Sequence, residues 1–288
     1  MDNVTGTVIT YNPDLSLLKN NLAAAVPQVS GMLIYDNGSS NVADIRELLS
    51  AFPSVELIEN GENLGLPINY NQASRKIGCV RGQNNSDNWL LILDQDTVLP
   101  EGYVQAASAF FGQEDISIIS CPYWDSNAEP FEEFQKKLPP EDVTYIQGCI
   151  SSGSLCRIRD ILNLGGFDEQ MFIDFVDYDY CQTVAEHGLK VLQLNRYCME
   201  HHIGNTKRVS LFGKPYNLHN HSAFRKYYII RNIVYYIRKH KANIKNSRWV
   251  YNSGIKFVVS TFLYEDDKWN KLRAMLKGFA DGFKMKLE

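Results

Sequence analysis

The sequence lacks several patterns that mark common classes of protein. No apolar run approaches the roughly 18–20 residues that a helix needs to span a bilayer, and no basic segment with a long apolar core precedes the first expected strand, so we expect neither a membrane span nor a signal peptide. The six cysteines include no Cys-x-x-Cys pair, which argues against a zinc site or a disulfide framework. No Gly-x-Gly-x-x-Gly turn follows that strand, which argues against a Rossmann-type dehydrogenase or methyltransferase. We therefore expect free thiols and a cytoplasmic protein.

The composition is that of an ordinary globular protein with an uneven distribution of charge. With 44% hydrophobic and 22% charged residues, 288 residues suffice for one large α/β domain with an appendage. The net charge of −4 divides into −17 for residues 1–204 and +13 for residues 205–288. Aromatic residues interrupt the basic part, which is typical either of a surface that attracts phosphates, on an anionic membrane or a nucleic acid, or of a solvated helical face.

Apolar stretches and helical patterns alternate through the first third of the chain. Strands are expected at 4–10, 31–35, 55–58 and 89–94, with helices between them near 15–22, 42–49 and 67–80. Such alternation predicts a parallel sheet with right-handed crossovers. A polar loop follows each of the four strands, and the ends of parallel strands lie at one edge of a sheet. These loops can therefore converge on one ligand.

The fourth expected strand ends at two acids. Residues 89–96 read Trp-Leu-Leu-Ile-Leu-Asp-Gln-Asp, a buried strand followed by Asp94 and Asp96. Carboxylates in this position are hard oxygen donors of the kind that Mg²⁺ or Mn²⁺ accepts together with a substrate diphosphate. The alternative interpretation is a solvated acidic turn.

Three later stretches carry further polar residues. A helix near 177–187 places Asp177 in its first turn, where the helix dipole favours the carboxylate; a capping role is the alternative. Of the adjacent His201 and His202, at most one is expected to reach a given metal. Residues 224–236 predict a helix with a basic and aromatic face.

Taken in order, these stretches resemble a bacterial family 2 glycosyltransferase with the GT-A fold, of the rhamnosyltransferase branch. The matching motifs are Thr10-Tyr11-Asn12-Pro13, Asp36-Asn37-Gly38-Ser39, Asn63-Leu64-Gly65 with Asn71, Asp94-Gln95-Asp96, Ser152-Gly153-Ser154, Gly165-Gly166-Phe167-Asp168-Glu169, Phe172-Ile173-Asp174-Phe175-Val176-Asp177, His202-Ile203-Gly204 and Arg225-Lys226-Tyr227-Tyr228-Ile229-Ile230-Arg231-Asn232. The resemblance implies a Rossmann-like, mostly parallel central sheet flanked by helices. It places the catalytic domain in 1–204 and a mainly helical, basic region in 205–288.

The resemblance also implies roles for individual residues. Asp177 is the expected general base for an inverting transfer, and Asp96 and His202 are the expected ligands of Mg²⁺ or Mn²⁺. Residues on the side of the donor sugar and acceptor are Ser152, Gly153, Asp174, Arg225, Tyr228 and Arg231. The nucleotide donor is expected to contact Thr10, Tyr11, Asn12, Asp36, Asn37, Asn63, Gly65, Asn71, Asp94, Gln95 and Asp96.

By the same resemblance, the substrates are a nucleotide-diphosphate sugar and a cell-surface polysaccharide or lipid-linked glycan. Rhamnose from dTDP-rhamnose is the first choice, and a UDP-hexose the second. The acidic first two-thirds of the chain would repel a nucleic acid, so we expect the basic region to contact the inner face of an anionic membrane, peripherally. An oligomer is possible, and the alternative function is a non-catalytic nucleotide-sugar-binding paralogue of the same fold.

Overall fold

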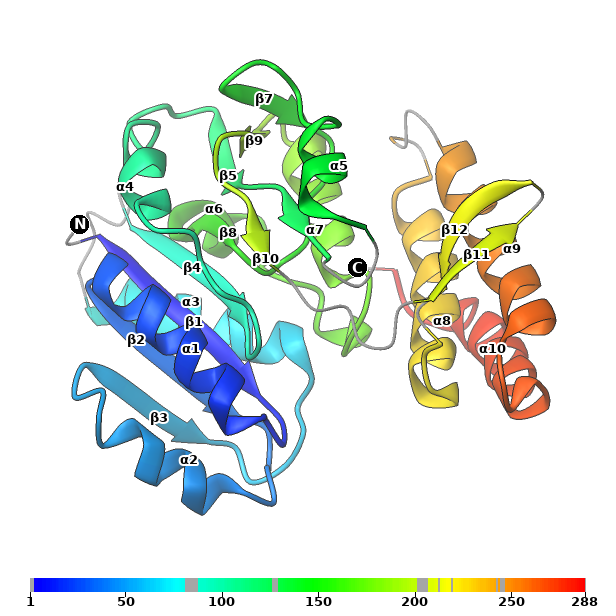
Figure 1. The fold of residues 1–288 in the computed structure, drawn as a ribbon, viewed down its shortest axis with the longest axis horizontal. Helices are drawn as coiled ribbons and strands as arrows, with labels where there is room; N and C mark the ends of the chain where they lie inside the picture. The colour runs from blue at the N-terminus through cyan, green and yellow to red at the C-terminus, as the bar shows by residue number, and fades with distance from the viewer. Residues whose placement is uncertain are drawn as a thin grey trace.

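A computed structural model of the chain describes most of the sequence, namely residues 3–80, 88–125, 129–200, 207–211, 213–218, 220–241, 243 and 247–287. Figure 1 shows a large sheet flanked by helices, beside a group of C-terminal helices. No helix in these ranges is both long and apolar enough to cross a membrane.

Within the described ranges, eight strands form the central sheet in the order β3-β2-β1-β4-β8-β5-β9-β7. The strands are β1 (Val4–Thr10), β2 (Gly31–Asp36), β3 (Val55–Glu59), β4 (Trp89–Asp94), β5 (Ile116–Ser120), β7 (Val143–Ile146), β8 (Ser154–Arg157) and β9 (Lys190–Leu194). β1 to β4 are mutually parallel, whereas β8 runs antiparallel between β4 and β5, and β7 antiparallel beside β9. Two short pairs, β6 (Tyr123–Trp124) with β10 (Met199–Glu200) and β11 (Lys207–Leu211) with β12 (Lys214–Leu218), lie outside this sheet.

Helices cover both faces of the sheet (Figure 1). The helices of the described residues are α1 (Leu15–Ala25), α2 (Val42–Leu49), α3 (Leu66–Val80), α4 (Tyr103–Ser108), α5 (Phe131–Gln135), α6 (Ile158–Asn163), α7 (Val176–Glu186), α8 (Ala223–Lys239), α9 (Ser247–Tyr264) and α10 (Lys268–Gly282), with short 3-10 turns η1 (Val26–Gln28) and η3 (Glu169–Met171). One apolar cluster joins the sheet to α1, α2 and α4, and a second joins it to α3, α6 and α7.

The strand sequences explain this layering. In β4, Leu90 and Ile92 belong to one apolar cluster, and Leu91 and Leu93 belong to the other. Because both faces are covered, the strand reads as a continuous apolar run. The expected parallel arrangement of the first four strands is confirmed. The antiparallel strand β8 was not predicted, because its residues belong to a stretch of small residues that resembles a loop.

Several cations of α8 have their partners inside the molecule. The basic and aromatic face predicted for residues 224–236 includes Tyr228 and Arg231, whose guanidinium lies 4.5 Å from the Tyr228 ring. Lys226 lies 1% exposed against Glu265, while Lys239 Nζ lies 2.8 Å from both Asp168 and Asp179. Arg238 donates to backbone carbonyls. Apolar residues of α8 also belong to the cluster that contains α7, so the division after residue 204 stays a prediction.

Candidate active site

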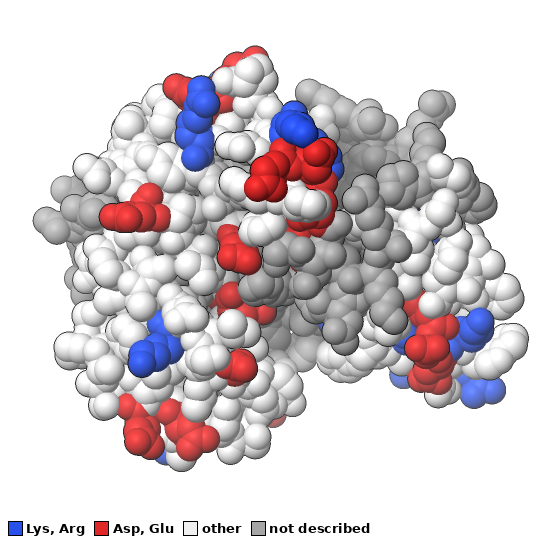
Figure 2. All heavy atoms as spheres, in the orientation of Figure 1, with Lys and Arg blue, Asp and Glu red and all other residues white. Residues whose placement is uncertain are grey.

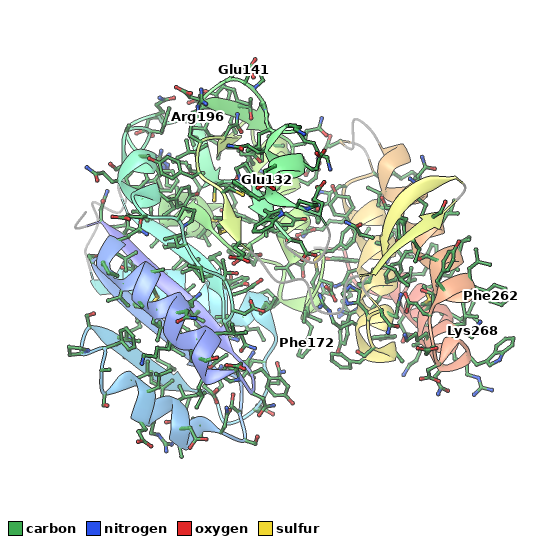
Figure 3. The ribbon with its side chains drawn as sticks, in the orientation of Figure 1. Glu132, Glu141, Phe172, Arg196, Phe262 and Lys268 are labelled. Atoms are coloured by element: carbon green, nitrogen blue, oxygen red, sulfur yellow. The ribbon has the colours of Figure 1, made fainter. Side chains whose placement is uncertain are left out.

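A cleft of about 920 Å³ opens at the carboxyl ends of β1 and β4. Its opposite wall consists of residues 172–178 and the beginning of α8, including Phe224 and Arg225. Figure 3 shows the labelled Phe172 between the sheet and α8. On the face drawn in Figure 2, carboxylates are spread over the sheet-containing part of the molecule, as the charge of residues 1–204 predicts.

Ten of the predicted site residues line this cleft. They come from loops far apart in the sequence that the parallel strands bring to one edge: Tyr11, Asn37, Asn63, Gly65, Asp94, Gln95, Asp96, Asp174, Asp177 and Arg225. Hydrogen bonds fix several of them. Gln95 Oε1 accepts from the Tyr11 amide at 3.0 Å, and Asn63 Oδ1 accepts from the Gly65 amide at 3.0 Å.

Four predicted donor contacts do not line the cleft, because their polar atoms hold loops together. The Asp36 carboxylate, 1% exposed, accepts from the Thr10 hydroxyl at 2.9 Å and from the Ser39 amide at 2.9 Å. Asn12 Oδ1 accepts from the Ser40 amide at 2.8 Å. Asn71 accepts from the Phe167 amide at 2.8 Å and donates to its carbonyl at 2.9 Å.

Four predicted residues of the sugar and acceptor side also lie outside the lining. The buried Ser152 hydroxyl accepts from the Asp94 amide at 2.9 Å, and the Gly153 amide donates to Ile92 at 2.8 Å. Tyr228 stacks on Phe172 with ring centroids 5.0 Å apart, and the Arg231 guanidinium lies 4.5 Å from the Tyr228 ring. These residues support the strand end and the loop that form the cleft.

Asp177 occupies the first turn of α7 and is partly buried in the cleft wall. Its Oδ1 accepts from the Tyr178 amide at 2.8 Å. The pKa of Asp177 is raised from 3.8 to about 6, mainly by burial. The nearby Asp174 and Asp94 contribute to this rise, and the backbone amides of Tyr178 and Ser151 oppose it. A carboxyl with this pKa is ionised at neutral pH yet basic enough to accept a proton.

The acids of the β4 end fit a divalent cation held jointly with a substrate. Asp94 and Asp96 line the cleft and provide hard oxygen donors. In the part of the chain that the structure describes, no three His, Cys, Asp or Glu side chains gather closely enough to hold an ion by themselves. Mg²⁺ is commonly held by one or two carboxylates plus substrate phosphates, which is the mode this arrangement suits. His202, the other predicted ligand, lies outside the described residues.

Residues 172–175 form a strained loop at the cleft. Phe172, Asp174 and Phe175 have φ values of 64°, 64° and 67°. Residues other than glycine rarely adopt this region of backbone conformation. Such strain persists where the surroundings hold it, and it is concentrated at functional sites. Asn232 of α8 supplies part of that support, because its Nδ2 lies 2.9, 2.8 and 2.7 Å from the carbonyls of residues 171, 173 and 174.

Arg225 and Arg231 secure the same loop. Arg225 Nε lies 3.2 Å from Asp174 Oδ2, within a bidentate pair. Arg231 Nη2 donates to the carbonyls of residues 170 and 171 at 2.7 and 2.8 Å. The conformation of the loop therefore depends on α8. Sequence reasoning missed Asn232 as a site residue, although a polar side chain between Arg231 and the apolar Ile233 was a usable signal.

A second cavity adjoins the cleft. Its volume is about 480 Å³, and it shares Tyr123, Ile150 and Tyr178 with the cleft. Part of its wall comes from the acidic, proline-rich stretch 122–142, with Phe134 and Lys137 among the lining side chains.

The sheet edge gathers carboxylates and amides into one cleft, facing a first-turn aspartate, as expected for a glycosyltransferase of the GT-A type. The chain belongs to glycosyl transferase family 2, whose model matches residues 7–174. It is 25% identical over 248 residues to the dTDP-rhamnosyl transferase RfbF of Shigella flexneri, covering 82% of this chain and 80% of that protein. It is 22% identical over 217 residues to the N-acetylglucosaminyl-diphospho-decaprenol L-rhamnosyltransferase of Mycobacterium tuberculosis, covering 62% and 69%.

Solved structures agree on the fold. TarS residues 1–349 from S. aureus, in complex with UDP-GlcNAc, match 99% of this chain and 81% of their own, with a TM-score of 0.59 and 15% identity. GalNAc-T7 with UDP, GalNAc and Mn²⁺ matches 99% of this chain with a TM-score of 0.62 and 13% identity; this chain spans 56% of it. The predicted family, branch and GT-A fold are confirmed, and the protein is a glycosyltransferase that uses a nucleotide sugar.

Proposed function

We propose that the protein transfers a sugar, with inversion, from a nucleotide-diphosphate donor to a hydroxyl of a glycan acceptor. The observation that carries this proposal is the position of Asp177. It lies at the start of α7, in the same cleft as Asp94 and Asp96, with a pKa of about 6. As general base, Asp177 takes the proton of the acceptor hydroxyl while that oxygen attacks the anomeric carbon and the nucleoside diphosphate leaves.

We propose dTDP-rhamnose as the donor, with a UDP-hexose as the second choice. The similarity to RfbF, a dTDP-rhamnosyl transferase, supports dTDP-rhamnose. The UDP-GlcNAc bound to TarS supports a UDP-hexose. Of the predicted donor contacts, the proposal keeps those that line the cleft. Tyr11 and Asn37 offer surfaces for the base, and Asn63 and Asp94 offer polar groups for the ribose.

We further propose that donor binding is metal-dependent through Asp96. A bound Mg²⁺ or Mn²⁺ would supply Lewis-acid stabilisation of the leaving diphosphate. The Mn²⁺ present with UDP in the GalNAc-T7 structure supports a divalent ion in this fold. Arg225 pairs with Asp174 at the cleft, and we propose that the loop it holds faces the donor phosphates.

The acceptor is proposed to be a cell-surface polysaccharide or a lipid-linked glycan at the inner face of the membrane. The similar mycobacterial protein is named as an N-acetylglucosaminyl-diphospho-decaprenol rhamnosyltransferase, and this lipid-linked sugar supports the second class of acceptor. The second cavity supports an approach from the side of Tyr123 and Tyr178, because it meets the cleft beside Asp177. Aromatic faces with Lys137 and Gln193 nearby suit a sugar ring, which combines apolar faces with hydroxyl groups.

The test is a screen of nucleotide sugars for binding, by calorimetry with and without Mg²⁺ or Mn²⁺, followed by turnover with acceptor glycans. We expect dTDP-rhamnose to bind in a metal-dependent way, and Asp96→Ala to abolish the metal dependence. Asp44→Ala, an exposed acid of α2 away from the cleft, is the matched control and should bind like the unmodified chain. Equal binding by Asp96→Ala would contradict the metal assignment.

The same screen separates the alternative function. A non-catalytic paralogue would bind a nucleotide sugar without transferring it to any acceptor. The cleft acids and the raised pKa of Asp177 favour catalysis.

A further inference from the structure

Helix α10 exposes several large apolar side chains, although it buries Met275 on its inner face. Its inner face is made partly of glycine: a Cβ at Gly282 would lie 2.6 Å from the Arg231 carbonyl oxygen of α8. Its outer face carries large apolar side chains with high exposure: Trp269 69%, Leu276 71%, Phe279 52% and Phe283 54%. A surface helix normally buries such residues and exposes polar ones.

Helix α9 shows a similar outward stripe. Tyr251, Ile255, Val258 and Phe262 are spaced by four, three and four residues, so they share one side of the helix. Their exposed fractions are 50%, 60%, 37% and 50%. The two helices meet at Lys268, whose Nζ lies 5.8 Å from the Phe262 ring centroid. Figure 3 shows both labelled residues at the outer edge of the molecule, pointing away from the sheet.

These eight apolar residues, which we name the α9–α10 outer face, have cations around them. The two helices hold six Lys and Arg residues, whereas the acids are Asp281 of α10 and the three residues 265–267 between the helices. Arg273 and Lys277 are exposed one turn apart on α10, and Lys284 and Lys286 follow its end. Lys271 is buried in an ion pair with Glu265, and Lys284 pairs with Asp281. Arg273, Lys277 and Lys286 have no carboxylate within ion-pair distance among the described residues.

We infer that the α9–α10 outer face binds an anionic lipid bilayer, lying in its interface. Trp, Phe and Leu on one side of a helix, with Lys and Arg along its edge, is the pattern of helices that lie in the headgroup region. Large apolar side chains that cluster on an exposed face mark interaction sites. A second copy of this chain is a poorer occupant, because a symmetric contact would bring two positively charged faces together.

This inference deepens the membrane part of the proposed function and names the surface involved. Helix α8 connects that surface to the cleft: Phe224, Arg225 and Ile229 line the cleft, while Gly282 of α10 packs on the backbone of α8 at Arg231. Since a helix with its side chains is roughly 10 Å across, docking places the cleft about two helix diameters above the bilayer. An acceptor carried on a lipid reaches such a site from the membrane side.

The test is co-sedimentation of the full chain with vesicles of phosphatidylcholine, with or without a quarter of phosphatidylglycerol. We expect binding to the anionic vesicles that weakens with added salt, because salt screens the cations. The double variant Trp269→Ser with Leu276→Ser should bind at least about tenfold more weakly. Lys277→Glu should lower the affinity roughly fivefold for the lost cation alone, or more with the added repulsion.

A matched control is Leu162→Ser with Tyr145→Ser, which removes two exposed apolar side chains from the sheet-containing part. This control should bind vesicles like the unmodified chain. Absence of binding to anionic vesicles, or equal binding by the double variant, would overturn the inference. So would a lipid-free dimer in sedimentation equilibrium that the double variant abolishes. We expect these variants to bind the donor normally by calorimetry. A failure of vesicle binding is therefore distinguishable from a failure of the proposed transfer reaction.

Discussion

Replacing Asp177 with Asn should abolish sugar transfer and at the same time stabilise the protein without its substrates. The cause is the pKa of Asp177, which burial raises from 3.8 to about 6. A carboxyl with a raised pKa resists ionisation, so its charge at neutral pH destabilises the folded state. Asparagine is nearly isosteric and carries no charge, and its Oδ1 can still accept the hydrogen bond from the Tyr178 amide.

The size of this effect follows from the shift in pKa. About two units, at roughly 1.4 kcal/mol per unit, give at most about 3 kcal/mol. Between pH 4 and pH 6 the folded state binds more protons than the unfolded state, so the free energy of unfolding of the unmodified chain falls as pH rises through this window. The advantage of Asp177→Asn should therefore be near zero at pH 4 and fully present above pH 7.

The assays are urea unfolding of both proteins between pH 4.5 and 8, and transfer with a fixed donor and acceptor. For a chain of this size, each kcal/mol corresponds to roughly 2 °C in melting temperature, so the gain at pH 7.5 is about 6 °C. Transfer by the unmodified enzyme should fall as pH drops through about 6, because the base becomes protonated. Donor affinity should remain. A variant of equal or lower stability at pH 7.5, or one with near-normal transfer, would refute the reasoning; Asp44→Asn is the control.

Two further variants test the supports of the site. Glu265→Gln leaves the ammonium groups of Lys226 and Lys271 buried without their carboxylate, and we expect a loss of about 3–5 kcal/mol in urea unfolding; an unchanged midpoint would show that these cations are solvated. Asn232→Ala removes the donor from three carbonyls of residues 171–174. We expect the free energy of unfolding to fall by about 1–3 kcal/mol and kcat/KM to fall by at least about tenfold. A loss of stability with normal kinetics would show that Asn232 does not control the strained loop.

Much of the site was predictable because parallel strands bring distant loops together. Asp94, Asp96 and Asp177 were expected in one cleft, and all three line it. Asp36 also follows a parallel strand, yet its carboxylate is enclosed by Thr10 and by the turn that follows it. The direction of a side chain at a strand end depends on such local hydrogen bonds, which the pattern of apolar and polar residues does not determine.

The ion-pair partners of the α8 cations could not be predicted, for a different reason. Lys239 and Arg225 pair with Asp168, Asp179 and Asp174, which lie 51 to 71 residues earlier in the chain. Counting charge along the sequence gives the correct asymmetry between 1–204 and 205–288, but it assigns the positive charge to the whole C-terminal region. The structure pairs several cations of α8 within the molecule, whereas Arg273 and Lys277 of α10 stay exposed.

This redistribution of charge also bears on how the protein would lie on a membrane. The −17 of residues 1–204 repels an anionic surface, whereas the cations of α9 and α10 attract it. The two forces act on opposite ends of the molecule (Figures 1 and 2), so they orient it as well as hold it. With the C-terminal helices down, the acidic cleft stands clear of the lipid phosphates, which would otherwise compete with the donor diphosphate for a divalent cation. In the proposed docking, the same asymmetry would both hold the protein on the membrane and keep the cleft available for the nucleotide.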